Sequence, residues 1–235
     1  MKISLDIEIY LNKESFSIPD VVNDYLFFSR FINEIAGQSS WYLTGSSKKE
    51  ALEKKFIENN NINKDIENKF IDKLTKSSPI YGSAIWDGDK NSIQIRNYLS
   101  GSFDNYKVIL NLILEVQPEL QYKIKNSILN LIINDYNFPK MLVHTNEYRL
   151  NENNVFPDRL PVGWMLYLNK KIMQEQLPMA AELIDIDNNK NKGTLIISTE
   201  HVFDGSNKDD IKKANEIEIQ LTGLGLLPLF TEIYS

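Results

Sequence analysis

Residues 80–99 read IYGSAIWDGDKNSIQIRNYL, and this stretch predicts an antiparallel β-hairpin. Two runs rich in β-branched and aromatic side chains, Ile80 to Trp86 and Ser92 to Leu99, flank the turn signal Asp87-Gly88-Asp89-Lys90. A second pair of strands is predicted at Leu183 to Asp187 and at Thr194 to Ser198, on either side of a polar connection. A sheet that is mostly antiparallel is therefore expected.

Strand and helix patterns alternate along the rest of the chain. Residues Lys2 to Tyr10 alternate apolar and polar side chains, which is typical of a half-buried strand. Val108 to Leu114 is an almost continuous apolar run, and we expect a strand that is covered on both faces. A long helix is predicted after Pro118, because apolar residues then recur at helical spacing.

Three capping boxes predict the starts of further helices, because a hydroxyl and a carboxylate three residues apart can bind the free amides of a first turn. These are Ser17-x-x-Asp20, Ser47-x-x-Glu50 and Ser206-x-x-Asp209. The helix after Ser47 is expected to include Phe56, and Gly37 is expected to end the first helix. The chain shows no internal repeat, flexible linker or step in charge, so we expect residues 1–235 to form a single α+β domain with a mixed, mostly antiparallel sheet flanked by helices.

Composition excludes several classes of function. The chain has 26 Lys+Arg and 32 Asp+Glu, a net charge of −6, so a nucleic-acid partner is not expected. It has no cysteine, which excludes disulfides, thiol nucleophiles and cysteine-based metal sites. It also has no apolar run of membrane-spanning length and no signal-peptide pattern at its start, so we expect a soluble cytoplasmic protein without a membrane partner.

No catalytic, cofactor-binding or metal-binding set is expected. Acid-x-Lys triplets of the kind found in magnesium-dependent nucleases begin at Glu53, Glu67 and Asp210, but chance alone produces about as many in this composition. The two histidines, His144 and His201, are not accompanied by a nucleophile motif, and structural roles are the simpler interpretation.

Two Asp-x-Asp pairs place carboxylates close enough to be candidate cation ligands. Asp185 and Asp187 alternate with apolar residues and are interpreted as the wet face of a strand. Asp87 and Asp89 lie in the predicted hairpin turn, where a carboxylate can bind its own backbone as readily as a cation. Trp86 directly precedes them, and an aromatic anchor beside acids is typical of a protein-binding hot spot. The candidate partner-binding residues are therefore Trp86, Asp87 and Asp89.

Three segments together resemble the immunity protein 52 family of bacterial toxin–immunity systems. They are Trp41-Tyr42-Leu43-Thr44-Gly45-Ser46-Ser47 with Glu50-Ala51, then Ala84-Ile85-Trp86-Asp87-Gly88, and finally a C-terminal block. That block contains Gly193-Thr194-Leu195-Ile196-Ile197-Ser198, Phe203-Asp204, Asn207, Ala214-Asn215-Glu216-Ile217-Glu218 and Gly225-Leu226-Leu227-Pro228.

The resemblance implies a non-enzymatic cytoplasmic protein that binds and neutralises a cognate toxin, typically one with a restriction-endonuclease-like nuclease domain. An acidic surface could enter the basic groove of such a nuclease, and residues from Glu182 onward contain ten acids and five lysines. Blocking at a distance from the toxin's active site is an equal alternative. A carboxylate- and histidine-dependent hydrolase is the rival function, and a small-molecule or adaptor module is a third. The sequence does not specify an oligomeric state.

Overall fold

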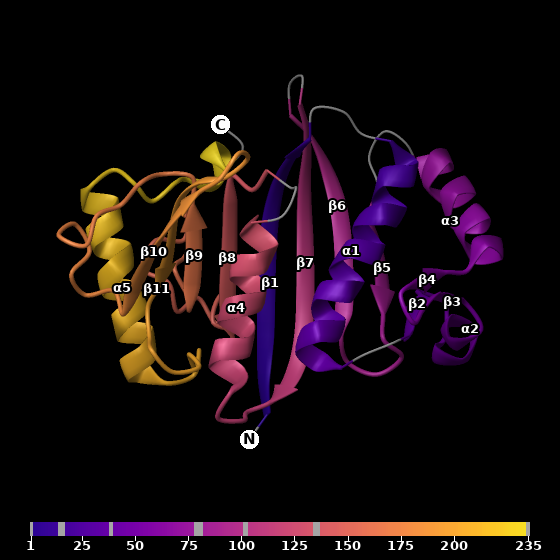
Figure 1. Ribbon diagram of the computed structural model, residues 1–235, viewed down its shortest axis with the longest axis horizontal. Coiled ribbons are helices and arrows are strands. Elements are labelled where there is room, and N and C mark those ends of the chain that lie inside the picture. Colours follow the sequence, from indigo (N-terminus) through magenta and orange to yellow (C-terminus); the bar gives the residue numbers. More distant parts are fainter. Residues whose placement is uncertain are drawn as a thin grey trace. The chain divides into compact units, whose positions relative to one another are not determined.

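The computed structural model describes residues 2–13, 17–37, 40–77, 82–100, 103–133 and 137–233. The chain forms two compact units (Figure 1). Unit 1 comprises residues 1–12 and 114–235, and unit 2 comprises residues 13–113. Each combines antiparallel strands with helices, which confirms the expected α+β class. The single-domain organisation of residues 1–235 stays a prediction.

Unit 1 contains a sheet with the strand order β10-β11-β9-β8-β1. Its strands are β1 (Lys2–Lys13), β8 (Lys140–Thr145), β9 (Met165–Leu168), β10 (Glu182–Asp187) and β11 (Lys192–Ile197). Its helices are α4 (Leu120–Ile133), α5 (Lys208–Gly223) and the short 3-10 helix η1 (Phe230–Glu232). The hairpin predicted from Leu183 onward is present as β10 and β11, which pair in antiparallel register.

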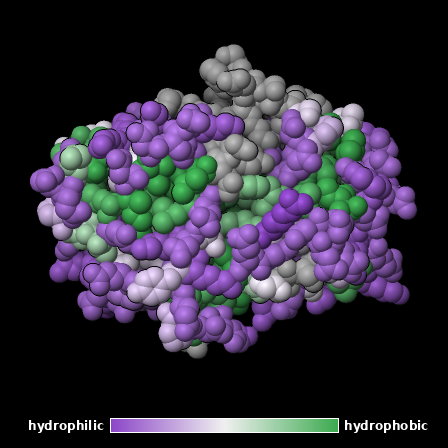
Figure 2. Space-filling view, viewed as in Figure 1, coloured by the Kyte–Doolittle hydropathy of each residue, from purple (hydrophilic) through white to green (hydrophobic). Residues whose placement is uncertain are grey.

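The sheet of unit 1 is packed on both faces, which explains why every residue of β8 is buried. On one face, Leu142 and Ile196 pack in a cluster with Ile217 and Leu221 of α5. On the other, α4 lies across β8 and buries the apolar stripe that the sequence predicts (Figure 1). The visible surface is mainly hydrophilic, and hydrophobic side chains gather over β9 to β11 (Figure 2).

The third predicted capping box is wrong in its detail. Helix α5 begins one residue later than expected, with Asn207 as its N-cap: the Asn207 side chain accepts hydrogen bonds from the amides of Asp209 and Asp210. The Ser206 hydroxyl instead donates to Asp204 Oδ1 at 2.6 Å, inside the preceding turn. An asparagine next to the serine offered the helix an equally good cap.

Unit 2 contains a sheet with the strand order β7-β6-β5-β2-β3-β4. Its strands are β2 (Ser40–Leu43), β3 (Lys55–Glu58), β4 (Asn61–Ile62), β5 (Gly82–Trp86), β6 (Ser92–Ser100) and β7 (Phe103–Glu115). Its helices are α1 (Ile18–Ala36), α2 (Lys48–Leu52) and α3 (Lys64–Ser77). The predicted hairpin of residues 80–99 is present as β5 and β6; its first two predicted residues, Ile80 and Tyr81, lie outside the described residues.

Helix α1 begins and ends where the sequence predicts. The Asp20 carboxylate accepts a hydrogen bond from the Ser17 amide at 2.8 Å, and Gly37 adopts the left-handed conformation (φ 71°) that ends the helix. The hydroxyl of its buried Tyr25 bonds Ser83 of β5 at 2.8 Å, which places α1 on the face of the sheet that carries Ser83 and Ile85. Figure 1 shows α1 across these strands.

The opposite face of this sheet carries side chains that are half-buried or exposed. Trp86, Gln94 and Arg96 share it, because alternate residues of a strand point to opposite faces and paired residues share one. In β7, Val108 and its alternate neighbours are buried, whereas Ile113 is 36% exposed. The expectation that Val108 to Leu114 is covered on both faces is therefore wrong, and the run has one dry face.

The predicted helix after Ser47 is shorter than expected. It ends at Leu52, and Phe56 belongs to strand β3, where it is fully buried. Lys54 reverses the chain so that β3 can pair with β2, and its backbone carbonyl accepts a hydrogen bond from the Leu43 amide at 3.0 Å. Pairing between distant segments thus overrode the local helical pattern.

Candidate functional site

Strand β2 pairs with only part of β5. Tyr42 is opposite Trp86 and Leu43 is opposite Ile85, and the pairing stops there. Strand β5 continues to Gly82 and is paired with β6 along its whole length on its other side. Among the described residues, no strand pairs with Gly82, Ser83 and Ala84 on the β2 side. We call these three residues the open edge of β5.

The local sequence explains why β2 ends at this point. The Glu50 carboxylate accepts a hydrogen bond from the Ser46 amide at 2.9 Å, and the Glu50 amide donates to the Ser47 hydroxyl at 3.2 Å. These two hydrogen bonds cap the start of helix α2, which four residues separate from the end of the strand. Gly45 permits the sharp change of direction, because a Cβ there would lie 2.8 Å from the Ala51 amide nitrogen. The chain therefore turns away from β5 while β5 still extends.

A cavity of about 630 Å³ lies at the open edge of β5. Helix α3 supplies one wall, the end of β2 and the segment before β3 supply another, and β5 and β6 supply the third. The lining residues are Leu43, Thr44, Glu53, Lys54, Ile66, Lys69, Phe70, Lys73, Gly82, Ser83, Ala84, Gln94 and Arg96. This volume is in the range of small-ligand sites.

The cavity lining is basic although the whole chain is acidic. Lys54, Lys69, Lys73 and Arg96 contribute four positive charges, and Glu53 contributes one negative charge. Lys54 is ion-paired to Glu50. The Arg96 guanidinium donates to Gln94 Oε1 at 3.3 Å, so both side chains are held over the sheet. A local excess of positive charge favours an anionic ligand.

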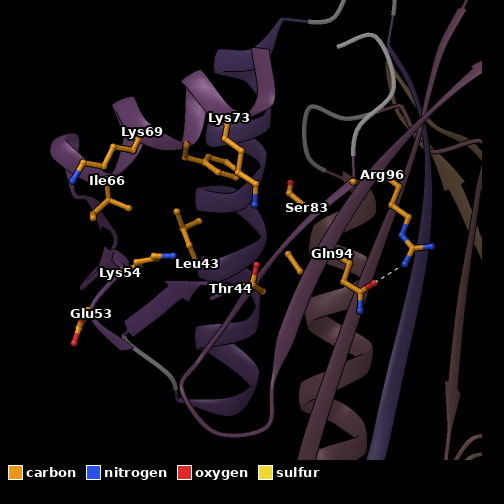
Figure 3. Close-up of a pocket in the computed structure, with 13 residues that line it drawn as sticks. Leu43, Thr44, Glu53, Lys54, Ile66, Lys69, Lys73, Ser83, Gln94 and Arg96 are labelled. Carbon is orange, nitrogen blue, oxygen red and sulfur yellow. Dashed lines mark hydrogen bonds between the residues drawn. The ribbon is translucent and has the colours of Figure 1, made fainter. Parts of the chain in front are cut away.

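Figure 3 shows how these side chains are arranged. Lys73 extends from α3 toward Ser83, and Leu43 and Thr44 face the same space from the β2 side. Lys69 and Glu53 point away from the centre. The centre of the cavity is therefore bounded by an apolar wall, the side chains of Lys54 and Lys73, and the backbone of a strand edge.

A second surface feature lies at the tip of the β5–β6 hairpin, where the sequence placed its candidate residues. Trp86 and Tyr42 are half-buried neighbours with ring centroids 6.4 Å apart. Lys48 Nζ lies 5.8 Å from the centroid of the Trp86 ring. Leu52 is 42% exposed, and both it and Tyr42 lie against Gly88 of the turn. We call Tyr42, Leu52 and Trp86 the hairpin-tip cluster.

The two turn aspartates have different surroundings. Asp87 Oδ1 accepts hydrogen bonds from the amides of Asp89, Lys90 and Asn91, at 2.8, 2.9 and 3.1 Å. Asp87 Oδ2 accepts another from Asn91 Nδ2 at 2.6 Å. Asp87 therefore stabilises the turn by binding backbone amides, as the sequence pattern allowed for this pair. The side chain of Asp89 is exposed. The partner-binding role of Trp86, Asp87 and Asp89 stays a prediction.

His144 is buried in the sheet of unit 1. Its Nδ1 lies 3.7 Å from Asp6 Oδ2 and its Nε2 lies 3.7 Å from Glu8 Oε1, and neither nitrogen has a hydrogen bond among the described residues. The Glu8 carboxylate in turn binds Arg149 and the Tyr10 hydroxyl. No serine hydroxyl bonds the ring within the part of the chain that the structure describes.

His201 forms a closer pair with an acid. Its Nε2 lies 2.9 Å from Asp210 Oδ1, and Asp210 Oδ2 also accepts a hydrogen bond from the Asp204 amide at 2.9 Å. The imidazole is largely exposed, and no serine hydroxyl bonds it among residues 2–13, 17–37, 40–77, 82–100, 103–133 and 137–233. The hydrolase alternative stays a hypothesis.

The acids of the C-terminal third are largely engaged. Glu182, Asp185, Asp187 and Glu216 form ion pairs with Lys125, Lys171, Lys192 and Lys212. Glu218 is buried, where it accepts hydrogen bonds from the amides of Val155 and Val162, and burial raises its pKa. The acidic face expected in this third stays a prediction.

The acid-x-Lys triplet that begins at Glu53 follows the end of α2 and includes Lys55 of β3. It therefore does not lie within the longer helix that the sequence predicts after Ser47. In the described residues, no group of three or more histidine and acidic side chains is arranged to hold a metal ion. None of the described helices is both long and apolar enough to cross a bilayer.

Sequence reasoning missed the basic cavity. Lys69 and Lys73 are four residues apart in α3, and this spacing signals one basic helix face. No local signal links that face to Arg96 or to the open edge, because both depend on where β2 leaves β5.

Comparison with known proteins gives little. No protein-family model and no curated protein matches the chain. Among solved structures, Pseudomonas aeruginosa T6SS protein PA0821 is similar with a TM-score of 0.49 and 10% sequence identity, covering 94% of this chain and 76% of that chain. So distant a likeness says nothing about what this chain binds, and membership of the immunity protein 52 family stays a resemblance.

Proposed function

We propose that this chain binds and neutralises a bacterial toxin by direct protein contact, without catalysing a reaction. The observation that carries the proposal is the hairpin-tip cluster: Tyr42, Leu52 and Trp86 present apolar surface beside an exposed Asp89. Aromatic side chains of this kind supply much of the binding energy at protein interfaces.

The rigidity of the turn supports the same function. Four hydrogen bonds to Asp87 fix residues 87–91, so little conformational entropy is lost when a partner binds the tip. The resemblance to the immunity protein 52 family supports a toxin with a restriction-endonuclease-like nuclease domain as the partner and the cytoplasm as the site of action.

The test uses growth protection and binding affinity together. Bacteria would express the toxin encoded beside the gene for this chain, with or without the chain, and calorimetry would give the dissociation constant of the purified pair. We expect Trp86→Ala to weaken binding by about tenfold or more and to reduce protection. Tyr122→Ala is the matched control, because Tyr122 is an exposed aromatic residue (59%) in α4 of unit 1.

Asp87 is left unchanged in this test, because its removal would unfold the turn and confuse stability with binding. Asp89→Ala can be combined with Trp86→Ala, since the Asp89 side chain is exposed and its backbone amide, which bonds Asp87, is retained. Full protection and unaltered affinity in the double variant would exclude the hairpin-tip cluster as the contact surface.

A further inference from the structure

We propose that the cavity at the open edge of β5 binds an extended acidic peptide, which adds to the sheet of unit 2 as a strand beside Gly82, Ser83 and Ala84. This site is separate from the hairpin-tip cluster and does not depend on the toxin-neutralising function. The occupant is inferred from three observations: the open edge, the shape of the cavity and the charge of its lining.

The open edge supplies the binding mode. A strand edge presents backbone amides and carbonyls that another extended chain can pair with. Three residues span about 10 Å at 3.3 Å each, which is enough for one segment of a short peptide. Strand β2 does not continue along this position, since the chain turns at Gly45 toward α2 instead of pairing with Ala84 and Ser83.

The cavity has room for the side chains of such a peptide. Its volume of about 630 Å³ holds several side chains in addition to a backbone. Leu43, Ile66 and Phe70 form an apolar wall, and successive side chains of an added strand would point alternately toward α3 and away from it. An apolar side chain at every second position therefore suits this wall.

The charge of the lining favours acidic side chains in the bound peptide. Lys73 reaches from α3 toward Ser83, and Arg96 and Gln94 lie over the sheet on the other side of the edge (Figure 3). The lining contains four cations, of which Lys54 is ion-paired to Glu50 and Lys69 points away from the centre, and one acid, Glu53, which also points away. Lys73 and Arg96 are therefore the charges that a bound peptide would meet. A basic peptide would meet repulsion there, so the charge gives specificity.

The experiment uses the full chain and synthetic peptides. The probe is a fluorescently labelled seven-residue peptide in which glutamate and valine alternate, and fluorescence anisotropy measures its dissociation constant. One analogue carries lysine in place of glutamate, and another carries N-methyl groups on its backbone amides, which block strand pairing. We expect both analogues to bind at least about tenfold more weakly than the parent peptide.

A matched pair of variants tests the location. Lys73→Glu reverses a charge of the cavity, and Lys76→Glu reverses an exposed charge of the same helix that does not line it. We expect Lys73→Glu to weaken binding of the parent peptide by about tenfold and Lys76→Glu to change it by less than about twofold. Hydrogen exchange of the wild-type chain, which needs no variant, should show increased protection at residues 82–84 when the peptide is bound.

Three results would overturn the proposal. If the glutamate and lysine peptides bind equally, charge does not select the peptide. If the N-methylated peptide binds as tightly as the parent peptide, the peptide does not pair with the strand edge. Unaltered exchange at residues 82–84 under saturating peptide would place the peptide elsewhere. Competition by inorganic phosphate with no effect of N-methylation would identify the cavity as a site for simple anions, which also contradicts the proposal.

Discussion

Asp87 and Asp89 lie two residues apart in one turn, yet only one of them has a side chain available to a partner. The Asp87 carboxylate accepts three backbone amides and the Asn91 side chain, whereas Asp89 contributes its own amide to Asp87 and keeps its carboxylate exposed. From residue type and position in the turn, each aspartate is equally suited to binding its own backbone or to contacting a partner. The hydrogen bonds to the Asp87 carboxylate show that Asp87 binds the backbone.

Lys140 is a buried charge whose removal has a predictable pH signature. Its side-chain nitrogen donates to the carbonyls of Glu232 and Ile233 at 2.9 and 2.6 Å, and so holds η1 against β8. Burial, with a smaller effect of the nearby Lys170, lowers the Lys140 pKa to about 8. The unfolded chain, with an ordinary lysine pKa, therefore binds more protons above this pH than the folded chain.

We expect the free energy of unfolding to rise by about 2 kcal/mol between about pH 8 and about pH 9.5, because the folded chain loses the Lys140 proton over this range while the unfolded chain largely keeps it. Lys140→Met should remove this rise, as measured by urea denaturation at each pH. Lys192→Met is the control, because Lys192 is an exposed lysine in the same unit. A wild-type chain that does not gain stability over this range would show that Lys140 keeps an ordinary pKa.

The helix and hairpins with clear cap and turn signals were predicted correctly, whereas boundaries decided by pairing between distant segments were not. The caps at Ser17 and Gly37 lie within four residues of the groups they bind, so the sequence specifies α1. The boundary between α2 and β3 depends instead on β2, which competes with the helix for the residues that follow Leu52. The basic cavity was also not predicted, because the open edge of β5 depends on where β2 ends.

Close approach of strands makes Gly193 of β11 a sensitive position. A Cβ there would lie 2.0 Å from the Leu168 carbonyl oxygen and 2.8 Å from Asn169 Cα, both of them backbone atoms next to the β9–β11 pairing. We expect Gly193→Ala to lower the free energy of unfolding by about 3 kcal/mol, since neither strand can move without breaking its ladder.

The matched control for this prediction is Gly223→Ala in α5, where an added Cβ meets no atom within 4 Å. That change should be neutral or stabilise the chain by up to about 1 kcal/mol, because it restricts the unfolded chain and favours the helix. Chemical denaturation of both variants gives the comparison. Equal stabilities of the two variants would mean that β9 and β11 accommodate a methyl group.

At the scale of the whole molecule, charge is distributed so that different surfaces favour different partners. The chain has a net charge of −6, but its cavity lining in unit 2 has an excess of cations, and four acids of the C-terminal third are paired with lysines. The net charge of the whole chain therefore predicts a basic partner. It gives no indication of a local site for an acidic partner. This is why composition could support toxin binding but gave no indication of the peptide site.

Long-range attraction by the net charge should appear in the kinetics of toxin binding. If the proposed toxin is basic, its association rate constant should fall several-fold between about 50 mM and about 500 mM salt, because salt screens the attraction.

Replacing Lys171 and Lys192 by glutamine frees Asp185 and Asp187 from their ion pairs and makes the net charge more negative by two. This double variant should associate faster at low salt, and the corresponding double arginine variant, which keeps the charge, should match the wild type. Stopped-flow measurements give the association rate constants. If the rate constant is the same in all three proteins and at both salt concentrations, charge steering is excluded. Short-range contacts such as those of Trp86 would then account for binding.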